Sequence, residues 1–518
     1  MYYLGIDAST QGVKGVIIDP QAGSVVSEAA VNFRCDLDKW NAPHGYIENT
    51  DPLIRHADPR MWLDGLDLLL QRFCEAGAPM GQVAGICGSA QQHGSVYLNE
   101  KIFSLLENMD QAASLSDHFR GSFSRQTSPI WMDRSTGEEC RELTEQFGET
   151  LQYITGSTAA ERFTGPQIRK FFKDSPQNYA QTCRIHLVSS FLCSILCGKD
   201  SPMDYGDAAG MNLLDLRDYK WSPEITEFTA PALADKLPAP VGGMTVAGKL
   251  SPYFAKYNLP PQIPVTVWSG DNPSSLIGTG CAIAGTAAIS LGTSDTLFAA
   301  LDNCRPDPEG CGHVMGNPAG GYMNLICFTN GSLAREEMKK CFALSWEEFD
   351  RYAESAAPAS GKLMLPYFQA ESTPKRLHPQ VVYNFDKDSA ATGEVIRALL
   401  ESQILSMKLH ARHLGGSFRK IRLTGGASSC RSIRQIIADV FGVEVEIIQI
   451  SNSAGLGAAM RSAASAGNIS WEELFDKFTA PIMTVKPDLS LQSAYDAALQ
   501  QYENLEKSYA LFPVRVGY

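Results

Sequence analysis

The chain has 518 residues, 44% of them hydrophobic, and a formal net charge of −13 at pH 7. This length exceeds what one hydrophobic core supports, so we expect two or three domains, and the apolar content excludes a disordered chain. The acidic balance argues against a nucleic-acid-binding protein, which normally carries a basic surface.

The cysteine pattern and the hydropathy indicate a reducing, aqueous compartment. None of the 13 cysteines forms a Cys-x-x-Cys pair, so a disulfide framework or a zinc site has little support. Cys193 and Cys197 lie one helical turn apart in an apolar stretch, where buried structural thiols are expected. No signal peptide is evident, and no apolar run reaches the about 18 residues that span a bilayer. We therefore expect a cytoplasmic protein that handles small molecules without membrane or nucleic-acid partners; a homodimer stays open.

The first 100 residues predict a hairpin, a loop, a helix and a buried strand. The strands and the helix are expected over 2–7, 13–19, 58–73 and 83–88, with an irregular loop over 32–58. Asp58 is suited to cap the helix. The last strand runs into the polar loop Ser89–Gly94. Ligands often bind at such carboxyl ends of strands in open α/β sheets.

The remainder alternates between helices and strands. Helices are predicted over 135–147, 179–196, 392–414, 431–440 and 452–464, and strands over 265–268, 287–291, 297–301, 363–368, 421–424 and 443–450. This alternation argues for α/β layers. A strand, a hydroxyl-rich turn and a returning strand occur near residue 5 and again near residue 290, without an exact periodic repeat. Two similar halves that face a cleft are therefore expected.

The two turns suit phosphate. Backbone N–H groups in a tight turn, added hydroxyls and glycines that allow close approach provide many donors in a small space. The candidates are Ser9, Thr10, Gln11 and Gly12 in the first turn, and Gly292, Thr293 and Ser294 in the second. Asp7 could orient a magnesium ion, usually through water, and Lys14 could add positive charge.

Each turn alone is also typical of an ordinary hairpin, because Ser, Thr and Gly are common turn residues. The two turns together with the glycine pair at 425 favour nucleotide binding. The P-loop pattern is absent at these sites, as is a GxGxxG motif after the first strand. A nucleotide would therefore bind in another way.

Six segments carry a family resemblance: GIDASTQGVK (5–14), GSAQQHGSV (88–96), ERFTGPQI (161–168), SGDNPSSL (269–276), ISLGTSDTLF (289–298) and LTGGASS (423–429). In this order they resemble the FGGY carbohydrate kinases over nearly the whole chain, and most of all the eukaryotic-type enzymes for xylulose. The resemblance implies two ribonuclease-H-like domains of the actin, Hsp70 and sugar kinase superfamily flanking a deep cleft. Residues 1–283 would mainly bind sugar, and 284–518 would mainly bind ATP. The implied reaction is Mg²⁺-dependent transfer of the γ-phosphoryl group of ATP to the terminal hydroxyl of D-xylulose.

The resemblance also implies roles for single residues. Asp271 would be the general base, because a carboxylate beside the sugar hydroxyl can accept its proton; Asp-Asn-Pro is otherwise a turn signal. His93, Arg162, Asp271 and Asn272 would hold the ketose, with Arg169 as a rival for Arg162. The nucleotide-side candidates are Trp346, Gly425, Gly426 and Ser429.

Two departures from the family pattern limit these roles. Ser372, within Gln369–Pro374, stands where many members have arginine, so we assign this segment no catalytic role. Ser429 and Cys430 follow the Gly-Gly-Ala-Ser motif where asparagine is frequent, and a reactive Cys430 would need a thiolate-stabilising setting. The alternatives are a kinase for another ketose or polyol, such as ribulose, glycerol or a tetrose, and a non-enzymatic actin-like nucleotide-binding protein. The Gln-Gln-His-Gly and Gly-Asp-Asn-Pro loops argue against the latter.

Overall fold

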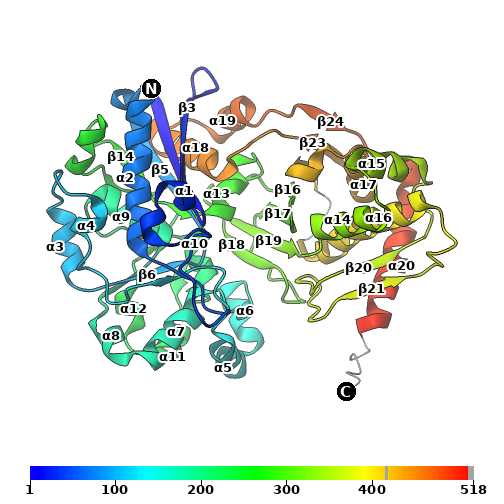
Figure 1. The fold of residues 1–518 in the computed structure, drawn as a ribbon, viewed down its shortest axis with the longest axis horizontal. Helices are drawn as coiled ribbons and strands as arrows, with labels where there is room; N and C mark the ends of the chain where they lie inside the picture. Colours follow the sequence, from blue (N-terminus) through cyan, green and yellow to red (C-terminus); the bar gives the residue numbers. More distant parts are fainter. Residues whose placement is uncertain (415–417, 511–518) are drawn as a thin grey trace.

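The computed structural model describes residues 1–414 and 418–510, and it contains two seven-stranded mixed sheets, one in each half of the chain (Figure 1). Among the described residues, no helix has the length and apolar character needed to cross a membrane. All 13 cysteines are free.

The first sheet has the strand order β13-β14-β5-β1-β2-β3, with β15 added beside β5. The pairs β3–β2, β2–β1 and β14–β13 are antiparallel, whereas β1–β5 and β5–β14 are parallel. The bounds are β1 (Tyr2–Ser9), β2 (Gly12–Asp19), β3 (Ser24–Asn32), β5 (Val83–Ala90), β13 (Val246–Lys249), β14 (Pro264–Thr266) and β15 (Ser269–Gly270).

The second sheet repeats this pattern. Its order from β19 is β19-β17-β16-β22-β23-β24, with two antiparallel pairs, two parallel pairs and a final antiparallel pair. β18 extends it beyond β19. The bounds are β16 (Thr286–Leu291), β17 (Asp295–Leu301), β18 (His313–Gly316), β19 (Tyr322–Phe328), β22 (Lys420–Thr424), β23 (Glu444–Ile447) and β24 (Met483–Val485). The prediction of two similar halves is confirmed.

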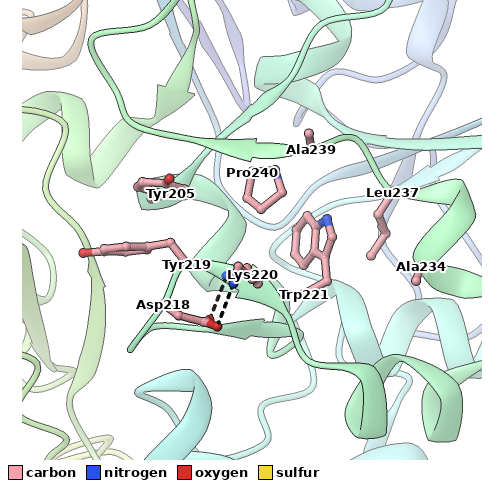
Figure 2. Close-up of a pocket in the computed structure, with 9 residues that line it drawn as sticks. All are labelled: Tyr205, Asp218, Tyr219, Lys220, Trp221, Ala234, Leu237, Ala239 and Pro240. Carbon is pink, nitrogen blue, oxygen red and sulfur yellow. Dashed lines mark hydrogen bonds and ion pairs between the residues drawn. The ribbon is translucent and has the colours of Figure 1, made fainter.

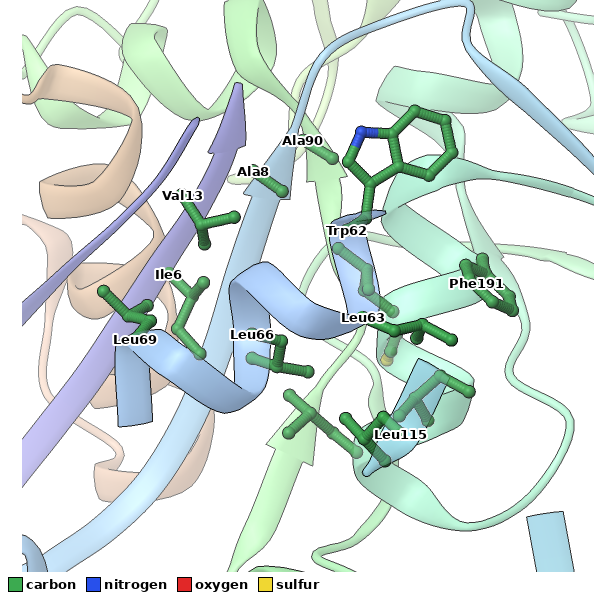
Figure 3. Packing of buried hydrophobic residues seen from close by; sticks show 14 of the residues in the cluster. Ile6, Ala8, Val13, Trp62, Leu63, Leu66, Leu69, Ala90, Leu115 and Phe191 are labelled. Atoms are coloured by element: carbon green, nitrogen blue, oxygen red, sulfur yellow. The ribbon is translucent and has the colours of Figure 1, made fainter. Parts of the chain in front are cut away.

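Both faces of the first sheet carry apolar side chains, and each face is covered by a helix. Helix α2 (Pro59–Glu75), capped by Asp58 through a 3.0 Å bond from Arg60 N, covers one face. Figure 3 shows Ile6 and Val13 of the sheet with Leu66 and Leu69 of this helix. Fully burying one such leucine contributes about 2 kcal/mol relative to leaving it exposed. Alternate strand residues point to the opposite face.

Helix α18 (Ser453–Gly467) covers that opposite face, although it comes from the second half of the sequence. It also crosses α13 (Asp271–Gly278) at glycine contacts. A Cβ on Gly278 would lie 1.8 Å from Ser453 O, and a Cβ on Gly457 would lie 1.9 Å from Ser274 O. Only glycine permits this approach. The contact joins the two halves of the chain through α13, the helix that begins at Asp271.

Further helices are α5 (Gly137–Phe147), α7 (Thr164–Asp174), α10 (Tyr205–Ala208), α14 (Ser332–Cys341), α15 (Trp346–Ser355), α16 (Thr392–His410), α17 (Arg431–Phe441) and α20 (Gln492–Ala510). The predicted loop over 32–58 contains only short elements, among them α1 (Phe33–Asp36) and β4 (His56–Ala57).

The single helix predicted over 179–196 is wrong. The segment comprises the end of α8 (Pro176–Gln181), strand β8 (Arg184–Leu187) and α9 (Val188–Cys197). β8 pairs antiparallel with β6 (Ser95–Leu98), so a distant strand partner overrides the local helical periodicity. The strand predicted over 265–268 ends earlier, because β14 stops at Thr266. A separate strand outside the predicted range, β15, follows it and brings Asp271 to the end of a strand that borders β5.

Candidate functional site

The first turn is a two-residue hairpin connection. Ser9 pairs with Gly12, so Thr10 and Gln11 form the loop. Ser9 Oγ donates to Gly12 O at 3.0 Å. Trp131 Nε1 donates to Thr10 Oγ1 at 2.8 Å, although the indole remains 43% exposed. Trp131 has no local sequence signal of its own, because this contact spans 121 positions.

The second turn occupies the equivalent place in the second sheet. Leu291 pairs with Asp295 and leaves Gly292, Thr293 and Ser294 as the loop, with both hydroxyl residues exposed. Gly292 O accepts from Ser332 N, the first residue of α14, at 3.0 Å. Arg335 of the same helix binds the Asp295 carboxylate. The start of α14 and the turn are thus held together.

Each turn lies beside the loop that follows the neighbouring parallel strand. Ala8 of β1 pairs with Ala90 of β5, which leads into Gln91–Gly94. Ser290 of β16 pairs with Thr424 of β22, which leads into Gly425–Ser429. Carboxyl ends of parallel strands are where open α/β folds bind ligands.

Asp271 is the first residue of α13 and directly follows β15. Its Oδ1 accepts from Asn272 N at 2.8 Å and from Asn272 Nδ2 at 3.0 Å. The same Nδ2 donates to Gln92 Oε1 at 2.6 Å. Burial and the negative charge of Asp7 raise the pKa of Asp271 to about 7. This value suits a group that must accept a proton near neutral pH.

Asp7 stands at the end of β1 and is 6% exposed, and its Oδ1 has no hydrogen-bond partner. Burial raises its pKa to about 6, offset in part by the nearby Ser89 hydroxyl and the charge of Lys14. Gln91 is fully buried and its amide is also unpartnered. Buried polar groups without partners are unusual and need an explanation. A hydrated cation beside Asp7 would supply a partner for its free oxygen.

Two of the sugar-side candidates, His93 and Arg162, both contact the ring of Phe163. His93, at φ 68°, donates from Nδ1 to Gly210 O at 2.9 Å, which leaves the Nε2 lone pair as an acceptor. Burial and the charge of Arg162 lower the pKa of His93 to about 3, so the ring is neutral. Phe163 lies between the rings of His93 and His313, at 4.7 and 5.2 Å. The left-handed backbone at a histidine costs on the order of 1 kcal/mol.

Arg162 contacts the second half of the chain. Its Nη2 lies 2.8 Å from Nε2 of His313 on β18. The rival, Arg169, instead pairs with Glu142 at 2.5 Å and binds Phe228 O. The sequence reasoning missed His313 and Gln92 as site residues. Gln92 lies within the quoted Gln-Gln-His-Gly motif, whereas His313 has no recognisable motif around it.

The nucleotide-side candidates share another region, in the second half. Trp346 begins α15 and is 49% exposed. Asp350 of the same helix accepts from Arg431 N and Ser432 N, each at 2.9 Å, at the start of α17. α17 directly follows the turn Gly426–Ser429, so Asp350 links α15 to that turn.

Gly425 has φ 93°, and a Cβ there would lie 2.4 Å from Leu291 O. Gly426 has no atom within 4 Å of the place of its missing Cβ, which leaves open space above the backbone. Burial raises the pKa of Cys430 to about 11. The setting therefore disfavours a reactive thiolate at Cys430.

The segment 369–374 has a structural role. Glu371 accepts from Thr329 N at 2.5 Å and from Asn330 N at 3.0 Å. It also accepts from Asn330 Nδ2 at 2.9 Å. It thus holds the loop that precedes α14.

Two cavities lie away from these residues. Figure 2 shows one of about 560 Å³ with Tyr205, Tyr219 and Trp221 in its wall. The other, of about 210 Å³, is bordered by Val25, Ile450 and Lys477. No predicted site residue lines either cavity.

Comparisons with known proteins cover nearly the whole chain. Residues 127–278 match the N-terminal domain, and residues 287–466 the C-terminal domain, of the FGGY family of carbohydrate kinases. Rat xylulose kinase is 37% identical over 523 residues, covering 97% of this chain and 96% of the relative. Xylulose kinase 2 of Arabidopsis thaliana is 38% identical, covering 89% and 86%. The structure of xylulose kinase from Rhodospirillum rubrum matches with a TM-score of 0.84 at 19% identity, covering 98% and 99%. The predicted two-domain fold is confirmed.

Proposed function

The chain belongs to the FGGY family of carbohydrate kinases, and we propose that it transfers the γ-phosphoryl group of ATP to the terminal hydroxyl of D-xylulose, giving D-xylulose 5-phosphate. The observation that carries the proposal is Asp271. Its carboxylate lies at the end of the central parallel strands, is oriented by Asn272, and has a pKa of about 7. The names of the relatives support xylulose as the sugar.

In the proposed reaction, Asp271 accepts the proton of the sugar hydroxyl as the new phosphorus–oxygen bond forms. His93 offers the Nε2 lone pair to a hydroxyl donor, and Arg162 offers donors to hydroxyl oxygens. Asn272 contributes the carbonyl oxygen of its amide, because its Nδ2 already faces Asp271 and Gln92. Together these groups match a ligand with several hydroxyls.

The phosphates of ATP would contact both turns. Backbone N–H groups and hydroxyls of Ser9–Gly12 and Gly292–Ser294 would bind phosphate oxygens. Gly426 and Trp346 would receive the nucleoside, because one leaves open backbone and the other offers an exposed ring. Ser429 stays a candidate on the same turn. Approach of the two halves would exclude water, which otherwise competes with the sugar.

Asp7 is the residue that would hold Mg²⁺, through water. Its unpartnered Oδ1 and the like charge of Asp271 fit a cation here. The ion, when bound, would neutralise charge on the phosphate oxygens. Lys14, opposite Asp7 on β2, would add to this.

The test is a substrate panel with coupled ADP detection. The proposal expects the highest kcat/KM with D-xylulose, and lower values with ribulose, glycerol and a tetrose. A higher kcat/KM for another member of the panel would reassign the substrate and keep the kinase. ATP binding without any sugar-dependent ADP would instead favour a non-enzymatic protein on this fold.

A further inference from the structure

We propose that His313 is a positioning residue that holds the guanidinium of Arg162 for the sugar, acting as a neutral hydrogen-bond acceptor supplied by the other half of the chain. The inference rests on the proposed function, because it requires Arg162 to contact the ketose. It assigns a role in sugar binding to the half that mainly binds nucleotide.

The strand that carries His313 is fixed against the first half. β18 pairs with β19 in the second sheet, but Val314 N donates to Gly156 O of the first half at 3.0 Å. His313 and Met315 are two residues apart, so their side chains leave the same face of the strand. His313 contacts Arg162, and Met315 Sδ lies 3.3 Å from Gln92 Nε2. One strand thus reaches two sugar-side residues.

The hydrogen bonds determine the tautomer of His313. A guanidinium has only donors, so Nε2 must accept from Arg162 Nη2 at 2.8 Å. Nδ1 then carries the proton and faces Ser157 Oγ at 3.2 Å. Burial, followed by the charge of Arg162 and the nearby His93, lowers the pKa of His313 well below its usual value. The ring is therefore neutral throughout the physiological pH range.

A neutral acceptor orients Arg162 without cancelling its charge. Among the described residues, no ion pair within 4.0 Å involves this guanidinium. Burial lowers its pKa, and Glu161 acts on it only as a nearby charge. The guanidinium also lies 5.6 Å from the centroid of the Phe163 ring. Without a directly paired carboxylate, its donors remain available for sugar oxygens. A carboxylate in place of His313 would form an ion pair and compete with the ligand.

The test compares His313→Leu, which removes the acceptor, with His313→Gln, which places an amide oxygen at a similar reach. KM for D-xylulose is expected to rise about 10-fold or more in His313→Leu, the size expected for a lost charge-assisted hydrogen bond. KM for ATP should stay within about twofold, and His313→Gln should stay within about threefold for both substrates. In an Arg162→Met background, His313→Leu should add almost nothing, because the partner is gone.

Three results would overturn the inference: an unchanged ketose KM in folded His313→Leu, an equal loss in His313→Gln, or additive effects in the double variant. If His313→Leu fails to fold, Ser157→Ala still removes the partner of Nδ1, and an unchanged ketose KM there counts against the proposal. The single variant Arg162→Met distinguishes a failure of the proposed sugar site from a failure of the role proposed for His313. If it leaves the ketose KM unchanged, the proposed sugar site fails. If it raises that KM while His313→Leu does not, only the role of His313 fails.

Discussion

The side-chain amide of Asn272 donates a 2.6 Å hydrogen bond to Gln92 Oε1. This contact fixes which end of the amide faces Asp271, because the same Nδ2 lies 3.0 Å from Asp271 Oδ1. Gln92 is 2% exposed, so its side of the bond is shielded from solvent. We therefore expect Gln92→Met, which keeps the volume but removes the acceptor, to lower kcat/KM for the sugar about 10-fold.

Gln92→Glu is the matched variant, because it keeps an acceptor for Asn272 while adding a charge near Asp271 and near Asp207, a buried residue of α10 beside Gln92. The added negative charge should raise the pKa of Asp271. Activity should therefore be kept at high pH, and as pH falls it should be lost earlier, at a higher pH than in the unaltered protein. Steady-state kinetics from pH 6 to 9 provide the comparison. Kinetics of Gln92→Met equal to those of the unaltered protein would remove Gln92 from the account.

The pKa of about 7 for Asp271 predicts an acidic limb in the pH profile. The base works only when ionised, so kcat/KM should fall as pH drops below about 7. Asp7→Asn removes the like charge, and the limb of its residual activity should move to lower pH. Arg162 and His93 do not mimic the limb, because a guanidinium stays cationic here and His93 has a pKa of about 3. Asp7, with a pKa of about 6, does titrate in this range, which is why Asp7→Asn is the informative variant. A limb near pH 4, typical of an exposed aspartate, would contradict this prediction.

Arg335 and Asp295 form a buried ion pair behind the second turn, with bonds of 2.7 and 2.8 Å and side chains that are each 1% exposed. Removing one partner leaves a buried charge, so Arg335→Met should lower the free energy of unfolding by about 3–5 kcal/mol. KM for ATP should rise as well, because the pair links α14 to the turn.

The double variant Arg335→Met, Asp295→Leu is the control. Replacing both charges by apolar groups should recover most of the lost stability, since burying an ion pair is itself costly. Chemical denaturation measures this difference. A double variant less stable than Arg335→Met would show that the pair is not the source of the effect.

His410 predicts a pH dependence of stability. Burial alone would lower its pKa, but Glu309, 2.7 Å from Nδ1, and Glu506, 3.4 Å from Nε2, outweigh burial and raise it to about 9. A raised histidine pKa contributes stability that is complete below about 6.5, its unfolded value, and is lost as pH rises through 9. His410→Gln should cost on the order of 2 kcal/mol at pH 6 and much less at pH 9.5. A loss that does not vary with pH would contradict the charged state of His410.

Sequence patterns predicted well those features that depend on neighbouring residues. Local alternation predicts the strands around both turns, capping preference predicts the cap at Asp58, and helical periodicity predicts α17. The error at 179–196 has a different origin, because β8 exists only through its pairing with β6 almost 90 residues earlier. Local periodicity carries no information about such a partner.

The candidate site shows the same difference between features set by neighbouring residues and features set by distant partners. The motifs single out Asp271, Asn272 and His93, and the structure adds hydrogen bonds from Asn272 to Asp271 and to Gln92, the residue that precedes His93 in its motif. Trp131 and His313 could not be found from sequence. Each is defined by one contact to a residue more than 100 positions away, Thr10 and Arg162 respectively.

The most direct test of the central claim is the turnover of Asp271→Asn with D-xylulose and ATP, measured beside its thermal unfolding at pH 8. We expect a loss of kcat of at least about 100-fold. We also expect a melting temperature equal to or above that of the unaltered protein, because the fold raises the pKa of this carboxyl and so disfavours its ionised form. Near-normal turnover in the folded variant would contradict the assignment of Asp271 as the base.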